Sequence, residues 1–228
     1  MDTASILYTA SVWVLPALFA ITLHEAAHGF VAWRLGDDTA KRQGRVTFNP
    51  LRHVDPFGTV LLPAILLIMK APFLFGWAKP VPVNFGRLNK PKRDMVWVAA
   101  AGPGINIALA FISALGLHIS TTLPGDFGLW LTDNLSNSLG LNAVLAVFNM
   151  LPVPPLDGGR VAVGLLPRPL ALPLARLEPI GLFIILGAVF ILPLLGSQLG
   201  LDLNVFNWLV AKPAMFVVQS IADLTGLE

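Results

Sequence analysis

Residues 15–34 read LPALFAITLHEAAHGFVAWR, and this stretch determines how the rest of the chain is interpreted. The twenty residues before His24 carry no charge, and then His24, Glu25 and His28 follow. Residues four apart lie on one face of a helix, so the two imidazoles can face one metal ion with Glu25 beside them. Two neutral His ligands and a Glu that takes a proton from water are the components of a zinc hydrolase site. Titratable groups at membrane depth are costly without partners, so the pattern predicts a functional site rather than two core histidines.

The composition is that of a membrane protein. The chain has 228 residues, which suits one domain (1–228), and 55% of them are hydrophobic while only 12% are charged. There is no Cys, so a metal would have to be bound by His and carboxylates. The net charge of +2 gives no reason to expect a nucleic-acid partner. The first apolar segment lacks a basic start and a small-residue cleavage site, so we expect a retained span.

We predict an all-α polytopic membrane protein with about five to six apolar segments, one of them re-entrant. The segments cover about residues 5–33, 59–69, 95–119, 135–151, 179–195 and 205–221. The second is too short to span, and Lys212-Pro213 interrupts the last, which either spans or lies at the interface. The catalytic core is expected over about 5–165, and C-terminal helices over about 178–224.

Cations set the expected orientation. Eleven of the 15 Lys and Arg residues lie between Arg34 and Arg93, and three more lie in 157–178. The positive-inside rule places both regions in the cytoplasm and the N-terminus outside, with the active site toward the cytoplasmic leaflet of a bacterial cell membrane. Residues 43–49 (QGRVTFN) and 81–87 (VPVNFGR) have partial alternation and are either two strands or ordinary cytoplasmic loops.

A catalytic zinc site needs a third protein ligand, and Asp157 is the best candidate. It follows a proline-rich stretch at the end of the fourth segment, and Gly158-Gly159 allow tight backbone geometry there. If the second segment does not cross and the third and fourth form an out-and-back pair, Asp157 returns to the leaflet of His24 and His28. The other candidate ligands are expected at the surface; they are His53, Asp55 and Glu178.

Three motifs resemble the site-2 protease family of intramembrane zinc metalloproteases, in the family's order and spacing across about residues 15–165. They are His24-Glu25-x-x-His28, Ala101-Gly-Pro-x-x-Asn106 and Asn149-x-x-Pro152-x-Pro154-x-Leu156-Asp157-Gly158. The resemblance implies zinc bound by His24, His28 and Asp157, with Glu25 as catalytic base. It also implies that Asn149 contacts the substrate backbone or oxyanion, and that a membrane-associated β-hairpin follows the first segment on the cytoplasmic side.

The chain departs from many relatives because it has room for neither a PDZ nor a CBS domain, and it resembles a minimal core. Asn106 lies near mid-bilayer beside small residues, where it either joins helices or contacts substrate. His118, near the outer end of the third segment, is expected to be interfacial and inert.

The expected function is zinc-dependent hydrolysis of a peptide bond within or next to a transmembrane helix of a single-pass membrane-protein substrate in the lipid bilayer. Two alternatives stay open: a metal-binding membrane transporter, and an inactive scaffold that binds clients without cleavage. The sequence shows no inverted repeat of the kind typical of transporters, and every catalytic position is filled.

Overall fold

The computed structural model describes residues 3–61, 65 and 78–227, and the elements in this part of the chain are helical. The longer helices are α1 (Thr3–Arg34), α4 (Pro91–Ser120), α5 (Gly125–Asn149) and α10 (Lys212–Thr225). The shorter α-helices are α2 (Thr39–Arg42), α6 (Asp157–Leu165), α7 (Arg168–Ala175), α8 (Glu178–Leu186) and α9 (Leu192–Leu199). Single turns of 3-10 or π type are η1 (Pro50–Arg52), η2 (Pro56–Leu61), η3 (Phe85–Arg87), η4 (Gly187–Ile191) and η5 (Asn207–Ala211).

Within the described residues, three helical stretches are long and apolar enough to cross a membrane. They are Ala4–Arg34, Pro91–Ser120 and Glu178–Leu199, the last comprising α8, η4 and α9. Each exceeds the roughly 20 residues that a bilayer-spanning helix needs. The molecule is therefore a membrane protein.

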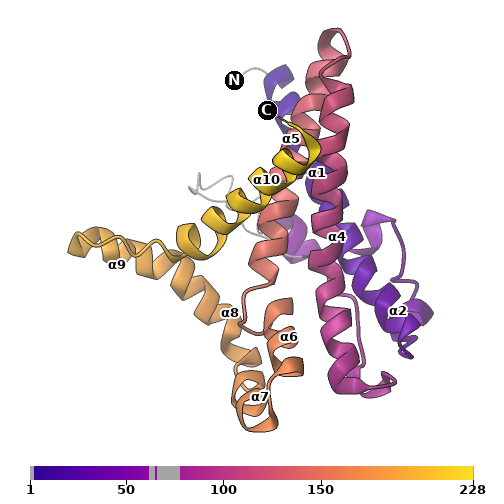
Figure 1. Ribbon diagram of the computed structural model, residues 1–228, viewed down its shortest axis with the longest axis vertical. Helices are drawn as coiled ribbons and strands as arrows, with labels where there is room; N and C mark the ends of the chain where they lie inside the picture. Colours follow the sequence, from indigo (N-terminus) through magenta and orange to yellow (C-terminus); the bar gives the residue numbers. More distant parts are fainter. Residues whose placement is uncertain (1–2, 62–64, 66–77, 228) are drawn as a thin grey trace.

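Helices α1, α4 and α5 run side by side along the length of the molecule (Figure 1). Small side chains allow the close approach, because Ala110 and Ala114 of α4 and Ala143 of α5 have no exposed surface. Helix α6 packs against α4, and α10 packs against α5. The α8–α9 stretch extends away from this bundle (Figure 1).

The prediction of five to six apolar segments was wrong, because α5 and α10 do not qualify as spans. Helix α5 contains the predicted segment 135–151, yet its polar residues lower its hydropathy below that of the three spans. These residues bond to neighbouring helices: Asn137 Nδ2 donates to Val12 O of α1 at 2.9 Å, and Ser113 Oγ of α4 donates to Ser138 Oγ at 2.8 Å. Helix α10 has only 14 residues. The predicted re-entrant segment at 59–69 lies mostly outside the described residues.

The predicted β-hairpin was also wrong, since no strand occurs in 3–61 or 78–227. Residues 43–49 form turns and bends, and 81–84 are followed by the single turn η3. The backbone groups that a ladder would use bond to side chains instead. Val81 N donates to Glu25 Oε2 at 2.7 Å and Asn84 N donates to Asp37 Oδ2 at 2.6 Å, while Lys79 O accepts from Arg45 at 2.6 Å.

Candidate active site

The two histidines predicted on one helical face lie next to each other on α1. His24 and His28 are buried, and their Nε2 atoms are 3.0 Å apart. The rings meet edge to face, with centroids 4.7 Å apart. One turn of uninterrupted helix is enough to produce this arrangement.

Asp157 joins them from the first residue of α6. Its Oδ2 lies 3.1 Å from His24 Nε2 and 3.3 Å from His28 Nε2. Two glycines allow the preceding loop to fold tightly, because a Cβ on Gly158 would lie 2.2 Å from Met150 O and one on Gly159 2.2 Å from Pro154 N. The α4–α5 pair returns the chain to the level of the histidines, so the predicted third ligand lies beside the other two.

The three donor atoms fit a zinc ion. Tetrahedral zinc with bonds of about 2.0–2.1 Å separates neighbouring ligand atoms by about 3.3–3.4 Å, close to the observed 3.0–3.3 Å. Asp157 Oδ2 is buried and has no hydrogen-bond partner among the described residues. Burial raises the pKa of the Asp157 carboxyl, but the adjacent imidazoles outweigh it and hold that pKa well below its usual value. A buried anion facing two imidazole nitrogens is the donor set of a metal cation.

The other ring nitrogens are occupied, which fixes how the imidazoles point. His24 Nδ1 lies 2.6 Å from Asn106 Oδ1, and His28 Nδ1 lies 2.7 Å from Val98 O. Both partners accept hydrogen bonds, so each Nδ1 carries the proton and each Nε2 directs its lone pair at the metal position. Asn106 Nδ2 donates to Asn142 Oδ1 at 2.7 Å, which holds the Asn106 carbonyl oxygen toward His24.

Gly102 of α4 lies directly against the histidine pair. A Cβ at this position would come within 2.5 Å of His28 Nε2 and 2.6 Å of His24 Nε2. Real Cβ atoms do not approach that closely, so any side chain here would displace the ligands. The sequence favours a helix-packing role for this residue, whereas the structure gives it a second role beside the metal position.

Glu25 lines a cavity of about 370 Å³ that contains the donor atoms. Its Oε2 accepts from Val81 N at 2.7 Å, so the non-helical segment 78–84 lies along the cavity. The lining also includes Asn149 at the end of α5 and Ile185 of α8. The cavity is large enough for several residues of an extended peptide, and its apolar lining suits hydrophobic side chains.

The remaining predicted positions have distinct environments. Asn149 faces the cavity and donates to Leu145 O at 3.0 Å. Asn106 is fully buried, with its carbonyl oxygen on His24. His53 is 2% exposed and contacts Thr47 O, so its predicted surface position was wrong. Glu178 is exposed and pairs with Arg160 at 3.1 Å.

Sequence reasoning missed the Val98 carbonyl and the contact of Gly102. A backbone carbonyl leaves no signal in the residue type, because every residue has one. The glycine could have been found from its place one turn before Asn106 on the same helical face.

Two His donors and one carboxylate donor, with a Glu beside them, define a zinc hydrolase centre within a helical membrane protein. Comparison with known proteins agrees. The chain is 41% identical over 193 residues to YwhC of Bacillus subtilis, provisionally named a zinc metalloprotease, and the match covers 79% of this chain and 80% of that protein. Rip2 of Mycolicibacterium smegmatis, named in the same way, is 31% identical over 141 residues, 62% of this chain and 52% of Rip2.

The chain is also 41% identical over 64 residues to MJ0611 of Methanocaldococcus jannaschii, a match that covers 28% of this chain and 31% of that protein. No family model and no solved structure matches the chain. The chain belongs to the site-2 protease family. It is a metalloprotease with zinc as its cofactor.

Proposed function

We propose that this metalloprotease hydrolyses a peptide bond within or next to a transmembrane helix of a single-pass membrane protein. The observation that carries the proposal is the place of His24 and His28 on α1, a helix that is apolar enough to span, with Asp157 brought beside them from α6. His24 and His28 precede Arg34 by ten and six residues, or about 15 and 9 Å of helix rise. A peptide bond that reaches these atoms would have to enter from the bilayer or its edge.

His24, His28 and Asp157 would hold the zinc ion, and when bound it polarises the scissile carbonyl and acidifies water. Glu25 takes a proton from the attacking water, whose oxygen bonds to the carbonyl carbon. Glu25 then delivers that proton to the amide nitrogen as the carbon–nitrogen bond breaks, so one water is consumed and a carboxylic acid and an amine result. Asn149, on the cavity wall, is placed to donate to the substrate backbone or to the oxyanion.

The substrate has to be extended at the cleaved bond, because a helical amide is shielded by its own hydrogen bonds. The non-helical segment 78–84 lies along the cavity and contacts Glu25 through Val81 N. A substrate segment would pair with those backbone groups of 78–84 that do not bond to Glu25, Asp37 or Arg45. We place the cavity mouth toward the cytoplasmic leaflet of a bacterial cell membrane and the N-terminus outside, since cations gather in 34–93.

The first experiment measures zinc in the detergent-purified protein. About one zinc per chain in wild type, lost in Asp157→Ala and retained in Asp126→Ala, is the expected result. Asp126 is an exposed residue in the first turn of α5, so it controls for loss of an acidic side chain. Full zinc retention in Asp157→Ala would contradict the assignment of the third ligand.

The second experiment tests cleavage. The enzyme is reconstituted with a tagged single-pass reporter protein, and the products are resolved by gel and mass spectrometry. Wild type should release fragments cut within or beside the reporter's membrane segment, and zinc-loaded Glu25→Gln should not. Zinc binding without cleavage of any reporter would favour a scaffold, and zinc transport into vesicles would favour a carrier.

A further inference from the structure

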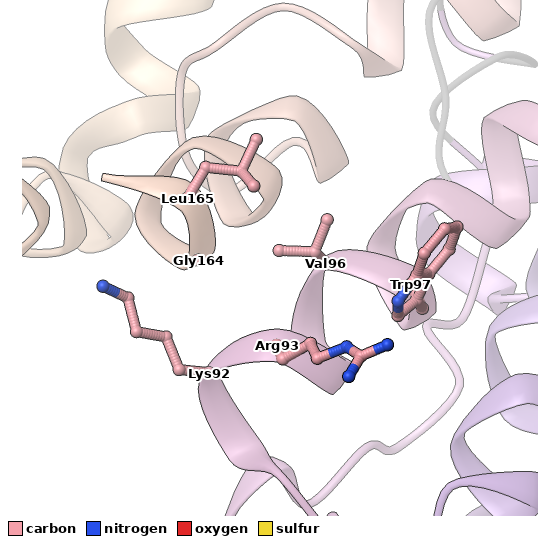
Figure 2. Close-up of a pocket in the computed structure, with 6 residues that line it drawn as sticks. All are labelled: Lys92, Arg93, Val96, Trp97, Gly164 and Leu165. Atoms are coloured by element: carbon pink, nitrogen blue, oxygen red, sulfur yellow. The ribbon is translucent and has the colours of Figure 1, made fainter. Parts of the chain in front are cut away.

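A second cleft lies between the first turn of α4 and the end of α6, away from the metal ligands. Its volume is about 420 Å³, and it is lined by Lys92, Arg93, Val96, Trp97, Gly164 and Leu165 (Figure 2). Figure 2 shows the Lys92 and Arg93 side chains projecting in opposite directions from α4, with Val96 between them, Leu165 on the facing helix α6 and Trp97 beside the Arg93 guanidinium. Neither zinc chemistry nor substrate hydrolysis uses any of these residues.

Helix packing fixes the walls of the cleft. A Cβ on Gly164 would lie 2.4 Å from Val96 Cγ2 and 3.0 Å from Lys92 O, so α6 approaches α4 as closely as a glycine allows. Lys92 Nζ donates to Leu166 O at 2.6 Å and joins the same two helices across the cleft. The close packing of α6 on α4 thus fixes how far apart the two walls of the cleft lie.

The charge at the cleft is positive. Lys92 and Arg93 are both exposed, and the Arg93 side chain forms no hydrogen bond or ion pair with another described residue. The adjacent Asp94 is 5% exposed, and its carboxylate accepts from Lys90 N at 2.7 Å. The two cations therefore have donors available for an anion.

The cleft has charged residues at one end and apolar residues beyond them, as a lipid has a charged headgroup followed by acyl chains. The cations occupy the first turn of a helix that can span, which is where headgroups lie. Trp97, 59% exposed, comes one turn further along α4, and Leu165 is 69% exposed. An indole at the interface followed by apolar surface is typical of protein that contacts glycerol and upper acyl chains.

We propose that this cleft binds an anionic phospholipid, with the headgroup phosphate between Lys92 and Arg93 and an acyl chain over Val96, Trp97 and Leu165. A soluble anion would use the two cations but not the apolar wall. A zwitterionic lipid would fill the wall, while its own cation would oppose Lys92 and Arg93. Both groups of contacts are satisfied together by a lipid with net negative charge.

The test counts bound lipid by native mass spectrometry, in neutral detergent at low ionic strength. Wild-type protein is titrated separately with phosphatidylglycerol and phosphatidylcholine. We expect the first phosphatidylglycerol to bind more tightly than the first phosphatidylcholine. Lys92→Gln combined with Arg93→Gln should weaken phosphatidylglycerol binding roughly thirtyfold, at the usual contribution of an interfacial cation, and leave phosphatidylcholine unchanged.

Matched variants make the result decisive. Lys41→Gln combined with Arg52→Gln removes two exposed cations elsewhere on the chain and should leave lipid binding unchanged. Arg93→Gln alone keeps the Lys92–Leu166 contact, and so preserves the fold if the double variant does not; it should weaken binding roughly fivefold. Unchanged phosphatidylglycerol affinity in Arg93→Gln, or an equal loss in the control pair, would overturn the proposal. Displacement of the lipid by inorganic phosphate at equal concentration would identify a site for soluble anions instead.

Discussion

At the scale of single residues, the site is defined as much by the atoms behind the ligands as by the ligands. His24 and His28 donate through Nδ1 to Asn106 and Val98, so the nitrogens that face the metal position are the unprotonated ones. Gly102 leaves the space in which the two Nε2 atoms meet. The ligands could be predicted from sequence because their chemistry requires His and Asp. The space beside Gly102 and the position of the Val98 carbonyl result from helix packing, which the residue types do not reveal.

Replacing Glu25 with Gln should separate metal binding from catalysis. The amide keeps the shape of the side chain but cannot accept the proton from water, so we expect turnover to fall on the order of 100-fold or more. Zinc content should stay near that of wild type. Activity in Glu25→Gln equal to wild type would rule out Glu25 as the base.

Gly102→Ala should disrupt the metal position although it adds only a methyl group and changes no polar or charged side chain. The new methyl group would lie within 2.6 Å of both Nε2 atoms, so the rings must move. We expect zinc affinity to drop at least about tenfold, measured by competition with a chelating dye. Gly104→Ala is the control, since a Cβ there meets nothing within 4 Å and zinc binding should be unaffected.

Asn106→Ala should weaken zinc binding through His24. Without the Asn106 oxygen, the His24 ring loses the acceptor that fixes its tautomer, and losses of this kind are roughly 10–100-fold in metal affinity. Asn137→Ala removes an interhelical amide that bonds to Val12 O and should leave zinc affinity unchanged. If zinc binding survives Asn106→Ala while turnover falls, the predicted substrate contact of Asn106 would be favoured.

At the scale of elements, segment 78–84 is held in place by hydrogen bonds to side chains and not by a β-ladder. Arg45, Glu25 and Asp37 bond to the backbone at 79, 81 and 84. Partial alternation in the sequence predicts strands, but periodicity does not reveal whether a backbone donor pairs with a strand or with a carboxylate. Helix α5 shows the same limit, because its polar side chains bond to neighbouring helices inside the bundle, as Asn137 does to Val12 O of α1 and Ser138 to Ser113 of α4.

Asp37→Ala should destabilise the end of α1 and segment 78–84. The buried carboxylate accepts from Asn84 N, Thr39 N and Thr39 Oγ1, and losing such contacts costs about 1–3 kcal/mol. The expected result is a lower thermal unfolding temperature in detergent. Asp38→Ala, which removes a partly exposed carboxylate paired with Arg42 and Arg87, should change it little.

The pKa of the Asp37 carboxyl also predicts how the stability of the fold depends on pH. Burial raises the pKa of its carboxyl, but the hydrogen bonds from Thr39 and Asn84 outweigh burial and hold that pKa below its usual value. Because the folded state binds the proton less readily than the unfolded state, this stability is present above about pH 4 and is lost as pH falls through the folded pKa. The difference in thermal unfolding temperature between wild type and Asp37→Ala should therefore become smaller below pH 4.

At the scale of the whole molecule, the site joins parts of the chain that lie far apart in sequence. Two ligands come from α1 and the third from α6, with the α4–α5 pair between them. Removing zinc should therefore loosen the contact between α1 and α6. We expect a chelator to lower the unfolding temperature of wild type and to have little effect on Asp157→Ala.

The order of these helices along the chain also has a consequence for biosynthesis. Ribosomes make α1 first, and the carboxylate on α6 follows only after α4 and α5 have been synthesised. A nascent chain that already contains the His-Glu helix therefore lacks the third ligand of its metal site. The late position of Asp157 therefore delays completion of the metal site until α1, α4 and α5 have all been made.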